Sequence, residues 1–296
     1  MVQFSQLAAI MLPVYIMIAI GFFWTRSNRT LDTDLIATLV NKIGLPCLII
    51  AIFSRIEINI NETQKFVLAS ILVVLIGGVI SAILVHLFKF FSSSYLPVMT
   101  FSLTGSLGLP LSLLSFGEKG LAYGLVFFTV TTIGTYRGGG ATAAGNLSFD
   151  KLSREPVTWS IIVAVFLIWP GFSLPKWIID TTWLLGAIAI PLQLLVTGSF
   201  LGRIESKFHY RTVIVSIVQL FVGFILGILV AELFHLSMTA RAILILQATI
   251  PVIILNYIFS IIFKCESTDV AEMDYVSTII SALVLPLILA WLINNG

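Results

Sequence analysis

The chain has 296 residues, of which 58% are hydrophobic and only 10% are charged, and its mean hydropathy is +1.08. Ordinary soluble domains carry roughly 25% charged residues, so this composition excludes a soluble globular protein and predicts an integral membrane protein. The formal net charge of +2 comes from small basic loops and gives no indication of nucleic-acid binding.

A helix needs roughly 20 apolar residues to cross a bilayer. Apolar stretches of about this length, separated by charged and turn-rich segments, predict ten membrane spans. The ten expected spans are residues 5–24, 35–53, 66–88, 95–117, 121–144, 157–172, 177–201, 212–231, 240–263 and 275–293. The first span lacks the basic residues with which a signal peptide begins, and it is longer than the apolar region of a signal peptide. We therefore interpret it as a membrane span and not as a cleaved peptide. The predicted fold class is therefore an all-α integral membrane protein.

Lysine and arginine residues are distributed unevenly over the predicted loops. Ten of them follow odd-numbered spans and five follow even-numbered spans, with Arg137 counted at the end of span 5. Positively charged loops tend to stay in the cytoplasm. The sequence therefore predicts that both termini lie outside. Glu118, just past the break in span 4, is interpreted as a solvated residue at a span end, with a functional role as the alternative.

Two pairs of proline-containing segments recur in the two halves of the chain, residues 1–147 and 148–296. IGLPCLIIAIFS around Pro46 corresponds to IAIPLQLLVTGS around Pro191, and GSLGLPLSLLSFG around Pro110 corresponds to QATIPVIILNYIF around Pro251. The prolines are 64 residues apart in the first half and 60 in the second. Five spans in each half force the two copies into opposite orientations, a pattern typical of secondary transporters. The alternative is that prolines are simply frequent in membrane helices.

The second proline of each half marks a break in a membrane helix. Gly105, Gly108 and Pro110 lie within six residues of each other inside span 4, and glycine and proline are poor helix residues. Irregular backbone at membrane depth is tolerated only where it is buried in protein or lines a wet cavity. Proline fits the first turn of a new half-helix, and two such amino ends facing one cavity form an anion site without any charged side chain. The breaks at residues 105–110 and 248–251 therefore predict the binding site.

These motifs resemble the auxin efflux carrier family of membrane transporters. The resemblance rests on GLPCLI, on GSLGLPL followed by FGEKGLA, on IPL ahead of TG in span 7, and on ATIPV with a later Asn, and it covers essentially the whole chain. It implies two inverted five-helix repeats, similar in fold to the bile acid:sodium symporters, with broken helices 4 and 9 crossing at their prolines. It also implies a scaffold of spans 1, 2, 6 and 7 and a transport domain of spans 3–5 and 8–10 that moves as an elevator.

The resemblance further implies a carboxylate substrate. Bacterial members of the family are described as permeases for malate, malonate and related acids, and plant members export auxin, which is also a carboxylate. Family members commonly carry asparagine in the span-4 break, where this chain has Thr104 and Ser106, and this difference leaves the identity of the acid open. The expected location is the plasma membrane, which is the inner membrane of a bacterium.

We expect the substrate to contact residues at the two breaks and two basic residues inside the spans. The predicted substrate-binding residues are Thr104, Gly105, Ser106, Gly108, Pro110, Gln247, Thr249, Pro251, Asn256, Lys42 and Arg137. The polar members alternatively make only helix-packing hydrogen bonds, and the basic ones alternatively snorkel to the lipid headgroups. All 14 acidic residues fall at span ends or in loops, which argues against a carboxylate-lined sodium site at the midplane. No metal site or cofactor is predicted, and the coupling ion, H+ or Na+, is left open.

The predicted function is a secondary carrier that moves a small organic anion by alternating access. The chain has no HExxH motif, no paired intramembrane aspartates and no GxSxG motif, so an intramembrane hydrolase is not expected. A sodium-coupled symporter similar to the bile acid carriers, a channel and a non-transporting membrane sensor are the alternatives. The expected partners are the organic acid and the lipid bilayer, with no nucleic acid, and a homodimer is left open.

Overall fold

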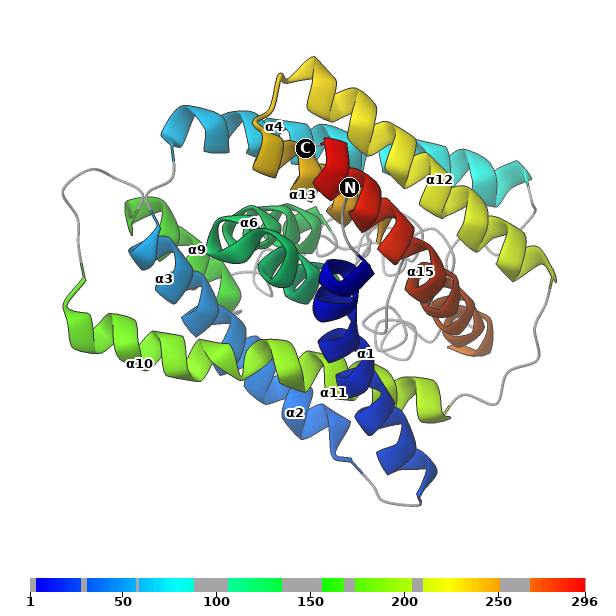
Figure 1. Ribbon diagram of the computed structural model, residues 1–296, viewed down its shortest axis with the longest axis horizontal. Coiled ribbons are helices and arrows are strands. Elements are labelled where there is room, and N and C mark those ends of the chain that lie inside the picture. Colours follow the sequence, from blue (N-terminus) through cyan, green and yellow to red (C-terminus); the bar gives the residue numbers. More distant parts are fainter. Residues whose placement is uncertain are drawn as a thin grey trace.

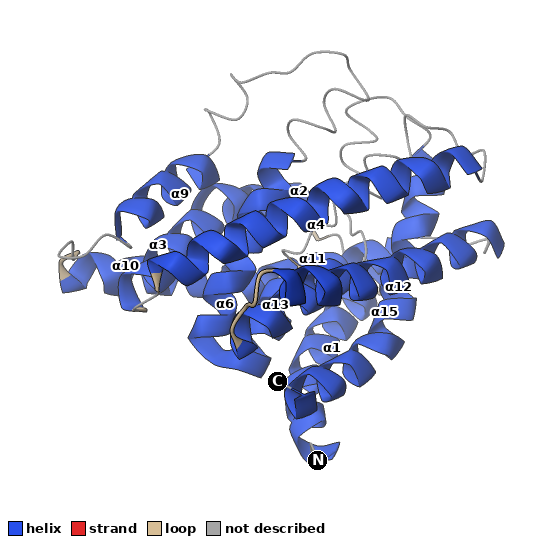
Figure 2. Cartoon of the chain, turned by 90° about the horizontal axis from the view of Figure 1, so that it is seen from above, coloured by secondary structure: helices blue, strands red, loops and turns tan. Residues whose placement is uncertain are grey.

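The computed structural model describes residues 4–27, 31–56, 59–87, 106–134, 156–167, 174–203, 210–250 and 267–295. Within these ranges all regular secondary structure is helical (Figure 1, Figure 2). The helices of the first part are α1 (Phe4–Arg26), α2 (Thr33–Leu39), the π-helical turn η1 (Val40–Gly44), α3 (Leu45–Arg55), α4 (Ile60–Leu87) and α6 (Gly108–Gly134). Those of the second part are α9 (Pro156–Leu167), α10 (Lys176–Ala187), α11 (Ala189–Arg203), α12 (Tyr210–Leu233), α13 (Met238–Thr249) and α15 (Ser267–Asn295).

Among the described residues, seven helical stretches are long and apolar enough to cross a membrane, and α9 and α13 are shorter apolar helices. Three of the seven are not single continuous helices. α2, η1 and α3 run on as one stretch, α10 and α11 as another, and α6 is interrupted by a turn at Gly117. Large apolar side chains face outward: Leu75, Leu229, Leu283 and Leu287 are between 62% and 72% exposed. Such faces suit contact with lipid and not with water. The chain is a multi-pass membrane protein, as its composition predicts.

Some helices extend beyond the apolar part that hydropathy detects. α4 begins at Ile60 and not near residue 66, and α15 begins at Ser267 and not near residue 275. The added residues include charged ones such as Glu62. Hydropathy finds the stretch that the bilayer requires, whereas a helix continues into the interface for as long as its backbone hydrogen bonds are made. The apolar stretch within α15 begins at Tyr275, as expected, whereas the stretch within α4 begins at Ile60, earlier than the expected residue 66.

α6 contains a sharp turn at Gly117 that divides it into two helical segments. Gly117 has φ +65° and ψ −159°, a backbone conformation that is essentially limited to glycine. The segments lie side by side, because a Cβ added at Gly124 would be 3.1 Å from Ser112 Oγ and 3.3 Å from a methyl group of Leu109. The turn coincides with the expected end of span 4.

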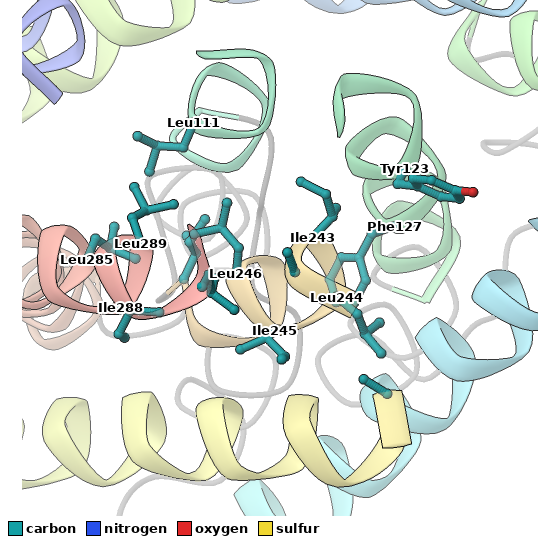
Figure 3. Close-up of a cluster of buried hydrophobic side chains, with 14 of the residues drawn as sticks. Leu111, Tyr123, Phe127, Ile243, Leu244, Ile245, Leu246, Leu285, Ile288 and Leu289 are labelled. Atoms are coloured by element: carbon teal, nitrogen blue, oxygen red, sulfur yellow. The ribbon is translucent and has the colours of Figure 1, made fainter. Parts of the chain in front are cut away.

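Buried apolar side chains form two clusters, and α6 contributes to both. The first lies among α1, α4, α6, α12, α13 and α15, and Figure 3 shows side chains of it from α6, α13 and α15. The second lies among α3, α6, α9 and the start of α11. In the same way, α12 packs against α4, α13 and α15, whereas α3 packs against α9 and α10. α6 therefore lies between two groups of helices (Figure 1).

Glycines allow several of these helices to cross at close range. A Cβ on Gly21 of α1 would overlap the carbonyl oxygen of Leu195 in α11. A Cβ on Gly186 of α10 would lie 2.6 Å from the Cα of Leu48 in α3. Small residues at membrane-helix crossings bring the backbones together and increase van der Waals contact. The pairs α1–α11 and α3–α10 are therefore closely packed units.

Candidate functional site at two helix ends

The amino end of α6 forms one side of the candidate site. Ser106 and Leu107 lie in a turn, and the helix begins at Gly108 with Pro110 in its first turn. Leu111 donates its N–H to the Leu107 carbonyl at 3.2 Å. The N–H groups before it have no intrahelical acceptor, so the missing N–H of Pro110 removes no bond that the helix would make. The helix starts within the segment where the sequence predicts a break.

The carboxyl end of α13 forms the other side. The helix ends at Thr249, and Ile250 has an extended backbone with φ −65° and ψ 127° while its N–H still bonds to the Leu246 carbonyl. Pro251 follows directly in the sequence, and a proline disfavours the helical conformation of the residue before it. The helix therefore ends where the sequence predicts the second break.

These two helix ends meet at the side chain of Gln247. This side chain is fully buried, with 0% exposure, and its Nε2 donates a hydrogen bond to Ser112 Oγ at 3.1 Å. The amide fits between two glycines of α6, since a Cβ on Gly108 would overlap Oε1 and a Cβ on Gly124 would lie 3.0 Å from Nε2. The start of α6 and the end of α13 are thus in direct contact, although they are far apart in the sequence.

The amide oxygen of Gln247 is buried and accepts no hydrogen bond from any described residue. Leaving a buried acceptor unpaired costs roughly 1–3 kcal/mol, and native proteins contain few such atoms. This oxygen lies against Gly108, at the amino end of α6. A water molecule or a ligand that carries a hydrogen-bond donor would satisfy it.

The helix ends give the site partial charges without any charged side chain. The amino end of α6 presents N–H groups and the positive end of the helix dipole, whereas the carboxyl end of α13 presents carbonyl groups and the negative end. In the helical pattern the Gln247 carbonyl would accept from residue 251, which is a proline without an N–H. The second amino end that the sequence analysis expects would follow Pro251 and lies outside the described residues.

A small cavity lies beside the carboxyl end of α13. It has a volume of about 60 Å³, and its lining from α4, α6, α12 and α13 includes the polar residues Ser81, Thr131, Gln219, Gln247 and Thr249. This volume accommodates only a few water molecules, so an organic acid would need space beyond it. A groove of about 850 Å³ between α4, α6 and the α3–α9 pair is lined almost entirely by apolar residues and offers no charged group for a carboxylate.

The remaining predicted site residues are placed as follows. Ser106 is half-buried in the turn before α6, and the buried Thr249 donates its hydroxyl to the Ile245 carbonyl of its own helix at 2.6 Å. Lys42 is exposed in the π-helical turn η1, a kind of irregularity that is frequent at functional sites. The predicted residues Thr104, Gly105, Arg137, Pro251 and Asn256 lie outside the described residues.

Sequence reasoning missed two residues of this site, Ser112 and Gly124. Ser112 lies four residues after Gly108, so both are on one face of α6, and that spacing was the available signal. Gly124 carries no comparable signal, because its role depends on the packing of α13 against the second segment of α6. In the part of the chain that the structure describes, no group of three or more His, Cys, Asp or Glu residues could hold a metal ion.

Comparison with known proteins gives two matches. A family described as "Membrane transport protein" matches residues 143–289, which is most of the second half of the chain. A protein of Methanocaldococcus jannaschii with the name "uncharacterized transporter" is 24% identical, over 97% of this chain and 98% of that protein.

Proposed function

We propose that this chain, which matches a family of membrane transport proteins and resembles the auxin efflux carriers, is a secondary carrier for a small carboxylate. The proposed substrates are malate, malonate or an acid similar to auxin. The proposed mechanism is alternating access, in which one group of helices moves against the other and exposes the site to each side of the membrane in turn.

The observation that carries this proposal is the contact of two helix ends at the buried Gln247. A carboxylate at the amino end of α6 would bind to N–H groups and the helix dipole, with no basic side chain required. The space left at Gly108 is filled by the amide oxygen of Gln247, which would accept a hydrogen bond from a hydroxyl group of the ligand, as in malate. The Ser106 hydroxyl and the second N–H of Gln247 Nε2 would donate to the carboxylate. In this proposal Thr104, Pro251 and Asn256 complete the site.

The packing of the helices supports a division into two moving parts. We name α1, α2, α3, α9, α10 and α11 the scaffold set, and α4, α6, α12, α13 and α15 the transport set. Most close contacts fall within a set, such as α1 with α11 and α12 with α13. A Cβ on Gly223 of α12 would even overlap the carbonyl oxygen of Ala248 in α13. Closely packed units that move against each other are a recurrent way of exposing a site to alternate sides.

A contact between matched positions supports the proposed inverted repeat. Gly44 and Ala189 each precede a matched proline by two residues, and a Cβ on Gly44 would lie 3.0 Å from the Cβ of Ala189. Equivalent positions of two repeats related by a two-fold axis touch each other only at that axis. The two prolines, Pro46 and Pro191, both lie in the first turn of a helix.

The first test is thermal stabilisation of the purified full-length protein by malate, malonate, citrate, indole-3-acetate and taurocholate, with uncharged controls and with or without sodium. A ligand that binds the native state raises the melting midpoint by mass action. We expect a shift with one class of carboxylate. A shift with none of these acids would contradict the proposed substrate class, and a strict requirement for sodium would indicate the sodium-coupled alternative.

The second test is flux of the acid that binds, measured in proteoliposomes. A carrier saturates with substrate and speeds up when the same substrate is present on the opposite side. A channel shows neither exchange acceleration nor a comparable saturation. Binding without any flux would instead indicate a sensor.

A further inference from the structure

An arginine at the end of α3 is held in place by an aromatic ring of α10. The guanidinium carbon of Arg55 lies 4.3 Å from the centroid of the Trp183 ring, a cation–π arrangement. α3 and α10 are also packed closely at Gly186 and Leu48. The positive charge is therefore fixed on the scaffold set.

A carboxylate from the transport set faces this arginine. Arg55 Nη1 lies 3.7 Å from Glu118 Oε1, and the two side chains are 37% and 38% exposed. Glu118 directly follows the turn at Gly117, where an added Cβ would meet no atom within 4 Å. Glu118 is partly exposed, as expected of a residue at a span end, and it also faces a cation of the other helix set.

The geometry makes this ion pair easy to exchange. Its separation of 3.7 Å is too long for a hydrogen bond, and half-exposed ion pairs are weak. The planar guanidinium forms its best contacts with a carboxylate through two parallel hydrogen bonds of about 2.7–2.9 Å. A free carboxylate can reach that arrangement, and Trp183 keeps the guanidinium in position when Glu118 leaves.

We propose that Arg55, held on Trp183, is a binding site for the carboxylate of the transported acid at the contact between the two helix sets, and that Glu118 occupies it as an internal competitor in this conformation. The proposal rests on the proposed function, because it takes the substrate to be a carboxylate. It adds a site distinct from the helix ends at Gln247. Displacement of Glu118 would also release the ionic link between the sets and so couple binding of the acid to their movement.

The test uses the full-length protein and four variants: Glu118→Gln, Arg55→Gln, the double variant, and Lys119→Gln as a control. Lys119 is the exposed neighbour of Glu118, so its replacement also removes one charge from this turn. The probes are malate and malonate, with malonamide as an uncharged analogue. Binding is measured by thermal shift in detergent, and KM by uptake into proteoliposomes.

We expect Glu118→Gln to tighten binding of malate or malonate by about two- to fivefold, since a weak competing ion pair is removed. Arg55→Gln should weaken binding by about three- to tenfold, since a charge-assisted contact to the acid is lost. The double variant should match Arg55→Gln, because Glu118 competes only through Arg55. Lys119→Gln and malonamide should show no such pattern.

Unchanged or weaker binding in Glu118→Gln would overturn the competition, and unchanged binding in Arg55→Gln would overturn the site. In either case the proposed function stands as long as the unmodified protein binds and transports a carboxylate. If the unmodified protein binds neither probe nor any other carboxylate, the proposed function fails and the Arg55 site fails with it. An Arg55→Lys variant with intermediate affinity would show that a loss in Arg55→Gln is not a folding defect.

Discussion

Gln247 is a neutral polar side chain enclosed between two glycines inside a membrane protein. Its amide nitrogen donates a hydrogen bond to Ser112, whereas its amide oxygen has no partner among the described residues. Its position depends on space that only glycine leaves at Gly108 and Gly124. Two single-residue changes separate its contribution to packing from its contribution to function.

Gly108→Ala should lower the melting midpoint and reduce transport. The new methyl group would overlap the amide oxygen of Gln247 and displace the side chain from Ser112, and overpacking of this kind costs about 1–3 kcal/mol. Thermal unfolding of the purified variant measures the effect. Gly77→Ala is the matched control, because its Cβ would make only an ordinary contact of 4.0 Å with Leu226. Equal stability of the two variants would contradict this packing.

Gln247→Leu should keep the melting midpoint near that of the unmodified protein or raise it. The change conserves volume and removes a buried unpaired oxygen, which offsets the lost bond to Ser112. Transport should fall by about tenfold, the equivalent of about 1.4 kcal/mol of lost ligand interaction. Retained transport with a lower midpoint would instead identify Gln247 as a helix-packing residue only.

At the scale of secondary-structure elements, the site depends on where α6 begins and where α13 ends. Proline marks both positions. Pro110 lies in the first turn of α6, where its missing N–H removes no helical bond, and Pro251 disfavours the helical conformation of Ile250, where α13 ends. Continuous helices through these points would cover the N–H and carbonyl groups that the proposed ligand contacts. In the proposed mechanism the breaks are therefore functional features of the elements.

Replacing both Pro110 and Pro251 with alanine should reduce uptake more than it reduces the amount of protein in the membrane. Alanine at position 251 supplies the N–H that the Gln247 carbonyl lacks and allows α13 to continue past Ile250. Pro13→Ala is the control, because Pro13 lies inside the continuous helix α1. Uptake should be compared at equal membrane content, and unchanged uptake in the double variant would refute a role for the breaks.

At the scale of the whole molecule, the proposed mechanism requires the transport set to move against the scaffold set. Two hydrogen bonds of α1, one between the two sets and one within the scaffold set, allow this movement to be tested with a matched control. The Tyr15 hydroxyl donates a hydrogen bond to the Ala282 carbonyl of α15, in the other set. Thr25 Oγ1 and Ser199 Oγ, 2.7 Å apart, join α1 to α11 within the scaffold set.

Cross-linking Tyr15→Cys with Ala282→Cys should block uptake, and reduction should restore it. The experiment uses a short, reducible bifunctional thiol reagent in a background without the native cysteines. The same reagent on Thr25→Cys with Ser199→Cys should leave uptake intact, because both residues stay in one set. Full uptake after complete cross-linking between α1 and α15 would exclude relative movement of the two sets at that contact.

Several features of this protein follow from its sequence alone. Hydropathy predicts the membrane class and the positions of the described spans, because the requirement of the bilayer for apolar length is local and additive along the chain. Prolines predict where α6 begins and α13 ends for the same reason, since their effect reaches only the neighbouring residues. These predictions need no knowledge of which helix lies next to which.

Only the tertiary structure decides which side chains meet. Gln247 bonds to Ser112, which is 135 residues away, and Arg55 lies between Trp183 and Glu118, yet no periodicity or spacing in the sequence links these positions. Such contacts depend on how the helices cross. At the Gln247 site, the missing side chains of Gly108 and Gly124 allow α13 to pack closely against α6. Local sequence therefore determined the helices and their breaks, and packing between distant segments determined the candidate binding groups.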